Sequence, residues 1–178
     1  QLMDIYYQIA IVYQKDGDLT NALEYYQICS NLAKQYHNDF KYINASLVGV
    51  GDIYCLQKKY NEAVAIHENI YELSLKINSP PAILFTSKHL LNDYYLMSDL
   101  KKAKPLANKT LELAYKQENV PDILECEKFV YQIDSASGDL ASAFPHYQKY
   151  LFLKNKLNDQ LVQKAAVQER FQTELNEQ

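Results

Sequence analysis

The sequence has no tryptophan and only three cysteines, four glycines and five prolines among its 178 residues. No apolar run approaches the roughly 18 residues that a membrane-spanning helix requires, so no span is expected in this segment. The cysteines Cys29, Cys55 and Cys126 are odd in number and form no C-x-x-C pair, so they indicate neither a zinc site nor a redox pair. Lysine and arginine are dispersed and the net charge is −4, so direct nucleic-acid binding by this segment is not expected.

Groups of residues that carry catalysis are also missing. The four histidines are isolated in the sequence: His37, His67, His89 and His146. His67 precedes a glutamate but lacks the second histidine of H-E-x-x-H, and Gly49 and Gly51 lack the strand and lysine of a phosphate-binding loop. The sequence therefore predicts no catalytic residue, no cofactor, no cofactor-binding residue and no metal ligand. We expect the chain not to be an enzyme.

What the sequence does contain is a long period. Its alanines Ala22, Ala63, Ala103 and Ala143 are 41, 40 and 40 residues apart. Nine residues before them stand Tyr13, Tyr54, Tyr94 and Asp134. Self-similarity at a period of roughly 20–50 residues is the signature of stacked repeats, each of which buries its apolar face against its neighbours. The period predicts an all-α solenoid that presents an extended binding surface.

The residues around each alanine resemble the tetratricopeptide repeat, W-x2-L-G-x2-Y…A-x3-F. In the second unit the matching residues are Val50-Gly51-x2-Tyr54 and Ala63-x3-His67. The resemblance covers residues 3–156 and implies an α-α superhelix of four helical hairpins plus a C-terminal helix. The repeats are predicted at about 3–36, 40–77, 80–118 and 121–156, followed by a capping or linker helix at 157–178.

Turn signals set the helix boundaries. Asp-Gly-Asp at 16–18 and Ser-Gly-Asp at 137–139 occupy equivalent places, where glycine ends one helix and aspartate caps the next. Pro80 and Pro121 stand in the first turns of helices. Nine helices are predicted, over about 3–15, 19–36, 40–57, 60–77, 80–97, 100–118, 121–137, 140–156 and 158–177.

The resemblance also implies where a partner binds, because the first helix of each tetratricopeptide unit lines the concave face. A protein or peptide ligand in this groove is predicted to contact Tyr7, Ile11, Val48, Asp52, Lys88, Asn92, Tyr95 and Gln132. Lys88-x3-Asn92 resembles the first half of the clamp by which chaperone-binding members hold a C-terminal carboxylate, although the basic residues that complete the clamp are absent. A solvated lysine beside a polar groove residue stays open as the alternative.

The C-terminal segment resembles a particular junction. Tyr147-x2-Tyr150-x2-Leu153, followed by a Gln/Glu/Lys-rich amphipathic stretch, is similar to the sensor regions of bacterial tetratricopeptide histidine kinases and helix-turn-helix regulators. The resemblance implies a non-catalytic sensor or interaction region of a bacterial signalling protein, periplasmic if membrane-linked and otherwise cytoplasmic. The alternative is a free-standing scaffold or co-chaperone adaptor. The chain begins at the edge of a repeat and stops inside a polar helix, so we expect a segment of a longer protein.

Heptad spacing gives the last helix a candidate seam of Leu157, Leu161, Lys164, Gln168, Phe171 and Leu175. Two of these six residues are polar, which disfavours a self-standing coiled coil. Two alternatives stay open: a homodimer through the C-terminal helix, and a capping helix that covers the end of the solenoid.

Overall fold

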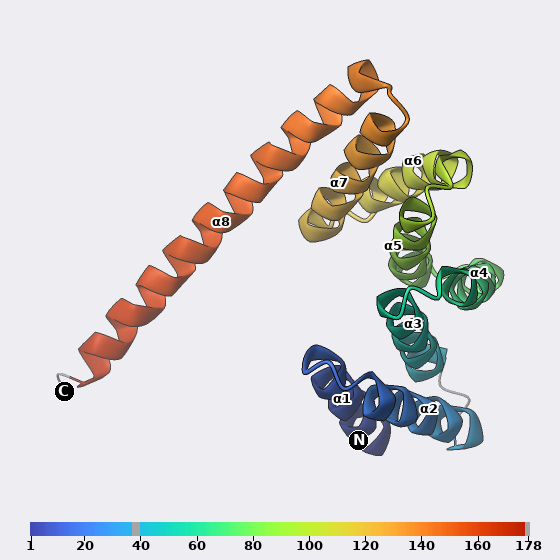
Figure 1. Cartoon of the computed structure of the whole chain (residues 1–178). Coiled ribbons are helices and arrows are strands. Elements are labelled where there is room, and N and C mark those ends of the chain that lie inside the picture. The colour runs from blue at the N-terminus through green and yellow to red at the C-terminus, as the bar shows by residue number, and fades with distance from the viewer. Residues whose placement is uncertain (37–39, 177–178) are drawn as a thin grey trace. The chain divides into compact units, whose positions relative to one another are not determined.

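The computed structural model describes residues 1–36 and 40–176, and all regular structure in that part of the chain is helical (Figure 1). Successive helices form hairpins, which confirms the predicted fold class. The helices are α1 (Leu2–Lys15), α2 (Leu19–Tyr36), α3 (Phe40–Leu56), α4 (Tyr60–Lys76), α5 (Pro80–Leu96), α6 (Leu100–Lys116), α7 (Val120–Ala136) and α8 (Leu140–Asn176). The chain divides into two compact units, Gln1–Leu106 and Ala107–Gln178, with the boundary inside α6.

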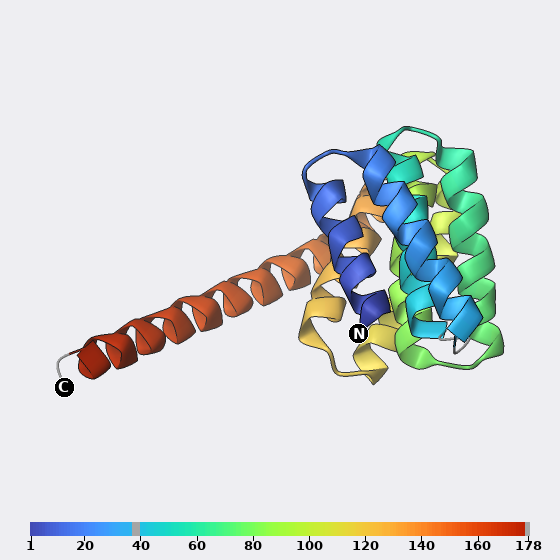
Figure 2. The same ribbon diagram turned by 90° about the horizontal axis from the view of Figure 1, so that it is seen from below.

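In the first unit each helix from α1 to α5 packs on the next, as Figures 1 and 2 show. Contacts also join α1 to α3 and α3 to α5, which are the first helices of three successive hairpins. A stack of hairpins produces both kinds of contact, because each hairpin buries its apolar face against the neighbouring one. The first helices therefore lie next to one another and build one continuous face.

The periodic alanines occupy equivalent buried positions. Ala22, Ala63 and Ala103 are fully buried and Ala143 is nearly so. A methyl group at these sites lets the facing helix approach closely, and any larger side chain would have to displace it. The core of the first hairpins also contains Tyr26 and Ile53, with half-buried tyrosines packed around them, among them Tyr7, Tyr13 and Tyr54.

The tight turns repeat the same backbone conformation. Gly17, Lys58, Ser98 and Gly138 all have positive φ, between 57° and 83°. The aspartates that follow cap the next helix: a carboxylate oxygen of Asp18 accepts from the amide of Asn21, and those of Asp99 and Asp139 accept from Lys102 and Ser142. The left-handed region disfavours residues with a Cβ, so the second and third turns are strained relative to the first and fourth.

This difference gives a testable prediction. Lys58→Gly is expected to raise the free energy of unfolding by about 1 kcal/mol, because glycine adopts a φ of 60° without the Cβ clash. The change is measured by urea unfolding followed by circular dichroism. Lys58→Ala keeps the Cβ and serves as the matched control. Its free energy of unfolding is expected to rise little. Equal stabilisation by both variants would show that loss of the lysine side chain, and not turn geometry, is responsible.

The C-terminal region differs from its prediction. Helix α8 runs without interruption over 37 residues, so the predicted break between residues 156 and 158 is wrong, and the described residues hold eight helices instead of nine. No glycine or proline occurs after Pro145, and good helix formers continue through the junction. The first part of α8 packs along α7, and the helix then continues past it (Figures 1 and 2).

The second half of α8 makes few contacts. Every side chain from Asn158 to Gln168 is exposed, including Leu161 of the proposed seam. Both roles named for this segment, capping helix and linker helix, stay predictions. The side chains of Phe171 and Leu175 lie outside the described residues.

Candidate functional site

Helices α1, α3 and α5 carry seven of the eight predicted groove residues, and six of these seven are half-buried. Tyr7 and Ile11 lie on α1, Asp52 lies on α3, and all three are half-buried. Lys88, Asn92 and Tyr95 on α5 are half-buried as well. Burial raises the pKa of the Tyr7 phenol, and the negative charge of Asp52 raises it further.

The other two predicted groove residues differ from these six. Val48 is 2% exposed, so its side chain belongs to the core. The groove position inferred for Val48 by resemblance stays a prediction, although this burial disfavours it. Gln132 lies on α7 in the second unit, where it is half-buried. Nothing tests the partner contacts of the other residues, which remain predictions.

Behind this face lies a buried polar network centred on His67 of α4, whose side chain is fully buried. Its Nδ1 is 2.6 Å from Oδ2 of Asp93, and its Nε2 is 3.2 Å from the carbonyl oxygen of Val48. The thiol of Cys55 donates to the other carboxylate oxygen of Asp93 at 2.8 Å. Asp93 is itself fully buried on α5. The network therefore ties α3, α4 and α5 together through charged and polar groups.

The partners of His67 determine its protonation. A carboxylate and a carbonyl oxygen both accept hydrogen bonds, so each ring nitrogen carries a proton and the imidazole is cationic. Burial acts to lower the pKa of His67, but the hydrogen bond to Asp93 and the charges of Asp93 and Asp52 outweigh it and raise the pKa above its usual value. The pair is a buried imidazolium and carboxylate, each compensating the other.

A second carboxylate and a second histidine lie beside this pair. Oδ1 of Asp52 accepts from Nδ1 of His89 at 2.8 Å and lies 3.9 Å from Nε2 of His67. The two imidazole rings have centroids 5.6 Å apart, and the ring of Phe85 packs edge-on against His89 at 4.9 Å. The side chains of Asp52 and His89 are 31% and 26% exposed. The cluster thus extends from the buried core to the face of α1, α3 and α5.

Glycine makes room for the buried ring. A Cβ added at Gly51 of α3 would overlap the imidazole of His67, and one at Gly49 would overlap the ring of Tyr26. The small residue before the periodic tyrosine in the repeat pattern therefore has a direct cause in the second unit. It lets α3 lie against the flat face of the imidazole.

Sequence reasoning missed this cluster because its members are distant in the chain. His67 and Asp93 are 26 residues apart, and Asp52 and His89 are 37 apart. A usable signal was present: His67 replaces the aromatic residue of the repeat pattern, and Asp93 directly precedes the periodic tyrosine. A polar residue at each of two core positions predicts that they meet, because buried polar groups need partners. His37 lies outside the described residues.

The second unit contains a comparable pair. Glu127 of α7 is buried, and its carboxylate lies 2.6 Å from Nδ1 of His146 on α8 and accepts from the hydroxyl of Tyr115 at 2.5 Å. Burial and the charge of Glu127 raise the pKa of the Tyr115 phenol. Unlike Asp52 and His89, this pair belongs to no larger group of histidines, cysteines and carboxylates within the described residues.

Comparisons with known proteins agree with this architecture. A family model described as the tetratricopeptide repeat matches residues 5–38, a range that contains most of α1 and all of α2. No similar protein is found among curated sequences. Together with the solved structures that share the fold, the match confirms the predicted tetratricopeptide repeat. No described helix has the length and apolar character needed to cross a lipid bilayer.

Three solved structures illustrate the shared fold. BtubC from P. vanneervenii is 16% identical with a TM-score of 0.76, and the match covers 88% of this chain and 65% of BtubC. The apo form of RapI is 15% identical with a TM-score of 0.80, covering 88% of this chain and 57% of RapI. A putative kinesin light chain from Podosopora anserina with tetratricopeptide-like repeats is 17% identical, with a TM-score of 0.73 and coverage of 86% and 75%. The chain thus spans less than two thirds of the first two proteins, and identities this low establish the fold alone.

Proposed function

We propose that this tetratricopeptide-repeat chain is a non-catalytic interaction module that binds a protein or peptide on the face built by α1, α3 and α5. The observation that carries the proposal is the contact of α1 with α3 and of α3 with α5, which joins the first helices of three repeats into one surface. Stacked repeats use such extended surfaces for binding. Half-buried side chains of mixed character, Tyr7, Asp52, Asn92 and Tyr95 among them, line this surface.

The proposal predicts that Tyr95→Ala and Lys88→Ala weaken peptide binding. Each is expected to cost about 1–2 kcal/mol, roughly a 5- to 30-fold loss of affinity, if its side chain is an anchor. The free energy of unfolding should change by no more than about 0.5 kcal/mol for a side chain at the surface. Peptides selected from a random display library against the wild-type chain provide the probe, and isothermal titration calorimetry gives the dissociation constants.

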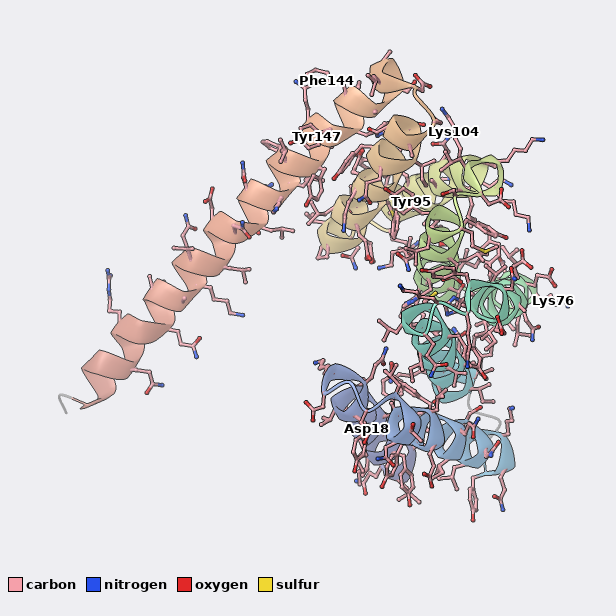
Figure 3. All side chains as sticks on the ribbon, in the orientation of Figure 1. Asp18, Lys76, Tyr95, Lys104, Phe144 and Tyr147 are labelled. Atoms are coloured by element: carbon pink, nitrogen blue, oxygen red, sulfur yellow. The ribbon has the colours of Figure 1, made fainter. Side chains whose placement is uncertain are left out.

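The matched control is Lys76→Ala, an exposed lysine at the end of α4 and away from the first helices (Figure 3). It is expected to bind the selected peptides as the wild type does. The proposed binding face is contradicted if Lys76→Ala weakens binding of the selected peptides while Tyr95→Ala and Lys88→Ala leave it unchanged. Failure of a diverse library to yield any micromolar binder also counts against it.

The finer role that we propose is the sensor or interaction region of a bacterial signalling protein. The continuous α8 supports this role, because a single helix leads from the packed repeats to the end of the segment without a flexible joint. A full-length reading frame that continues α8 into an output domain is the expected finding. A reading frame that ends just beyond residue 178 would favour the scaffold or adaptor instead.

An adaptor of the carboxylate-binding kind makes its own prediction from Lys88 and Asn92. Peptides with a free C-terminal carboxylate should then bind more tightly than the same peptides with an amidated C-terminus, because the lysine cation pairs with the anion. Equal binding of the two forms excludes the carboxylate clamp and leaves the general interaction role in place.

A further inference from the structure

We propose that Asp52, His67 and His89 form a binding site for a divalent transition-metal ion, with zinc as the preferred ion. Each of the three side chains offers one ligand atom, and these atoms all lie within 4.8 Å of one another. They come from three different helices, α3, α4 and α5, so only the folded repeat stack brings them together. The site goes beyond the interaction role proposed above and does not depend on it.

The distances suit a site that closes around an ion. Zinc binds imidazole nitrogen and carboxylate oxygen at about 2.0–2.2 Å in a tetrahedral arrangement, which sets ligand atoms roughly 3.4 Å apart. Asp52 Oδ1 lies 2.8 Å from His89 Nδ1 and 3.9 Å from His67 Nε2, on either side of that spacing. Asp52 and His89 are partly exposed, so rotations of their side chains can bring both ligand atoms to bonding distance.

His67 is already held in the orientation of a metal ligand. Its Nδ1–H donates to Asp93 at 2.6 Å, which fixes the ring with Nε2 3.2 Å from the carbonyl oxygen of Val48 and 3.9 Å from Oδ1 of Asp52. A histidine whose second nitrogen donates to a carboxylate is the usual arrangement around bound zinc, because the carboxylate orients the ring and raises its basicity. On binding, the Nε2 proton, which now faces the carbonyl of Val48, leaves to solvent and the nitrogen lone pair bonds to the ion.

The set of donors selects the class of ion. Two imidazoles and one carboxylate suit zinc and its neighbours in the first transition series, whereas calcium and magnesium prefer oxygen ligands throughout. Three protein ligands leave one tetrahedral position for water or for a group of a bound partner. Asp52 and His89 are 31% and 26% exposed, so water or a partner's group can reach their side of the site.

The test is zinc binding by the full chain after removal of metal ions, measured by calorimetry and by competition with a zinc-sensitive dye. One ion per chain is expected. His89→Ala and Asp52→Asn should each weaken binding at least tenfold, because each removes one of three ligands. Asp93→Asn should weaken it 10- to 100-fold through the orientation of His67. Substitution of cobalt should give a visible absorption spectrum that disappears in His89→Ala.

Two control variants separate this site from other sources of affinity. His146→Ala removes a histidine that pairs with Glu127 in the second unit, and Cys126→Ser replaces a thiol of α7 in that same unit. Both are expected to bind zinc within twofold of the wild type. The proposal is overturned if the wild type binds no more tightly than His89→Ala, or if either control variant loses binding as His89→Ala does. Peptide binding by these variants is measured separately, so the result for the metal site does not decide the proposed interaction role.

Discussion

Asp93→Ala is expected to lower the free energy of unfolding by about 3–5 kcal/mol, because it leaves the buried imidazole of His67 without its carboxylate. The loss combines a buried charge that has no counter-charge with a cavity at the α4–α5 contact. Urea unfolding followed by circular dichroism measures the effect. Hydrogen exchange at amides of α4 and α5 shows whether the destabilisation is centred there, since repeat proteins unfold in parts.

Two further variants identify the cause. Asp93→Asn keeps the shape and can still donate to a neutral imidazole, so its loss should be smaller than that of alanine. The double variant His67→Phe/Asp93→Leu removes both charged groups, and we expect it to be more stable than either single variant. Additive losses in the double variant would contradict a coupled ion pair. A loss of unfolding free energy below about 1 kcal/mol in Asp93→Ala would also contradict a coupled ion pair.

Tyr26→Ala is expected to destabilise the first unit by about 3–5 kcal/mol, as large-to-small changes of buried aromatics do. The side chain is 2% exposed, its ring lies against Gly49, and its hydroxyl donates to Gln14 at 2.6 Å. Alanine would leave a cavity between α2 and α3 that the rigid helices cannot close. The midpoint of urea unfolding of the whole chain, with tyrosine-region circular dichroism, reports the change.

The matched variant Tyr26→Phe keeps the ring and loses only the hydrogen bond to Gln14, so it should cost about 1 kcal/mol. Burial raises the pKa of this phenol, which agrees with an uncharged hydroxyl inside the core. If phenylalanine proves as costly as alanine, the hydrogen bond and not ring packing dominates at this position.

The repeat architecture could be predicted because it rests on local signals. Alanine at a fixed period and Asp-Gly-Asp at a turn act within a few residues of where they stand, and the corresponding helices begin at Leu19, Leu100 and Leu140 as expected. The break near residue 157 was wrong because the polar residues there do not stop a helix without glycine or proline. The helix propensity of these residues is enough to continue α8 through the junction.

The polar cluster could not be predicted in the same way. Whether His67 meets Asp93 depends on which face of α4 turns toward α5, and that is decided by packing across 26 residues of intervening chain. Val48 shows the same limit, since its position by analogy with the family placed it at the surface and the structure buries it. Residue type and spacing fix the fold of each hairpin, whereas the partners of a side chain depend on the hairpins that are stacked against it.

The exposed half of α8 has a mechanical consequence. From residue 158 to residue 176 the helix is about 28 Å long at roughly 1.5 Å per residue. The packed half supplies the nucleus that an isolated helix lacks, so each further turn needs only propagation to form. Such a helix acts as a lever: a rotation of about 10° at the contact with α7 moves its far end by about 5 Å. Loss of helical structure within this segment would shorten the lever, so helix propensity there sets how far a movement of the repeats is carried.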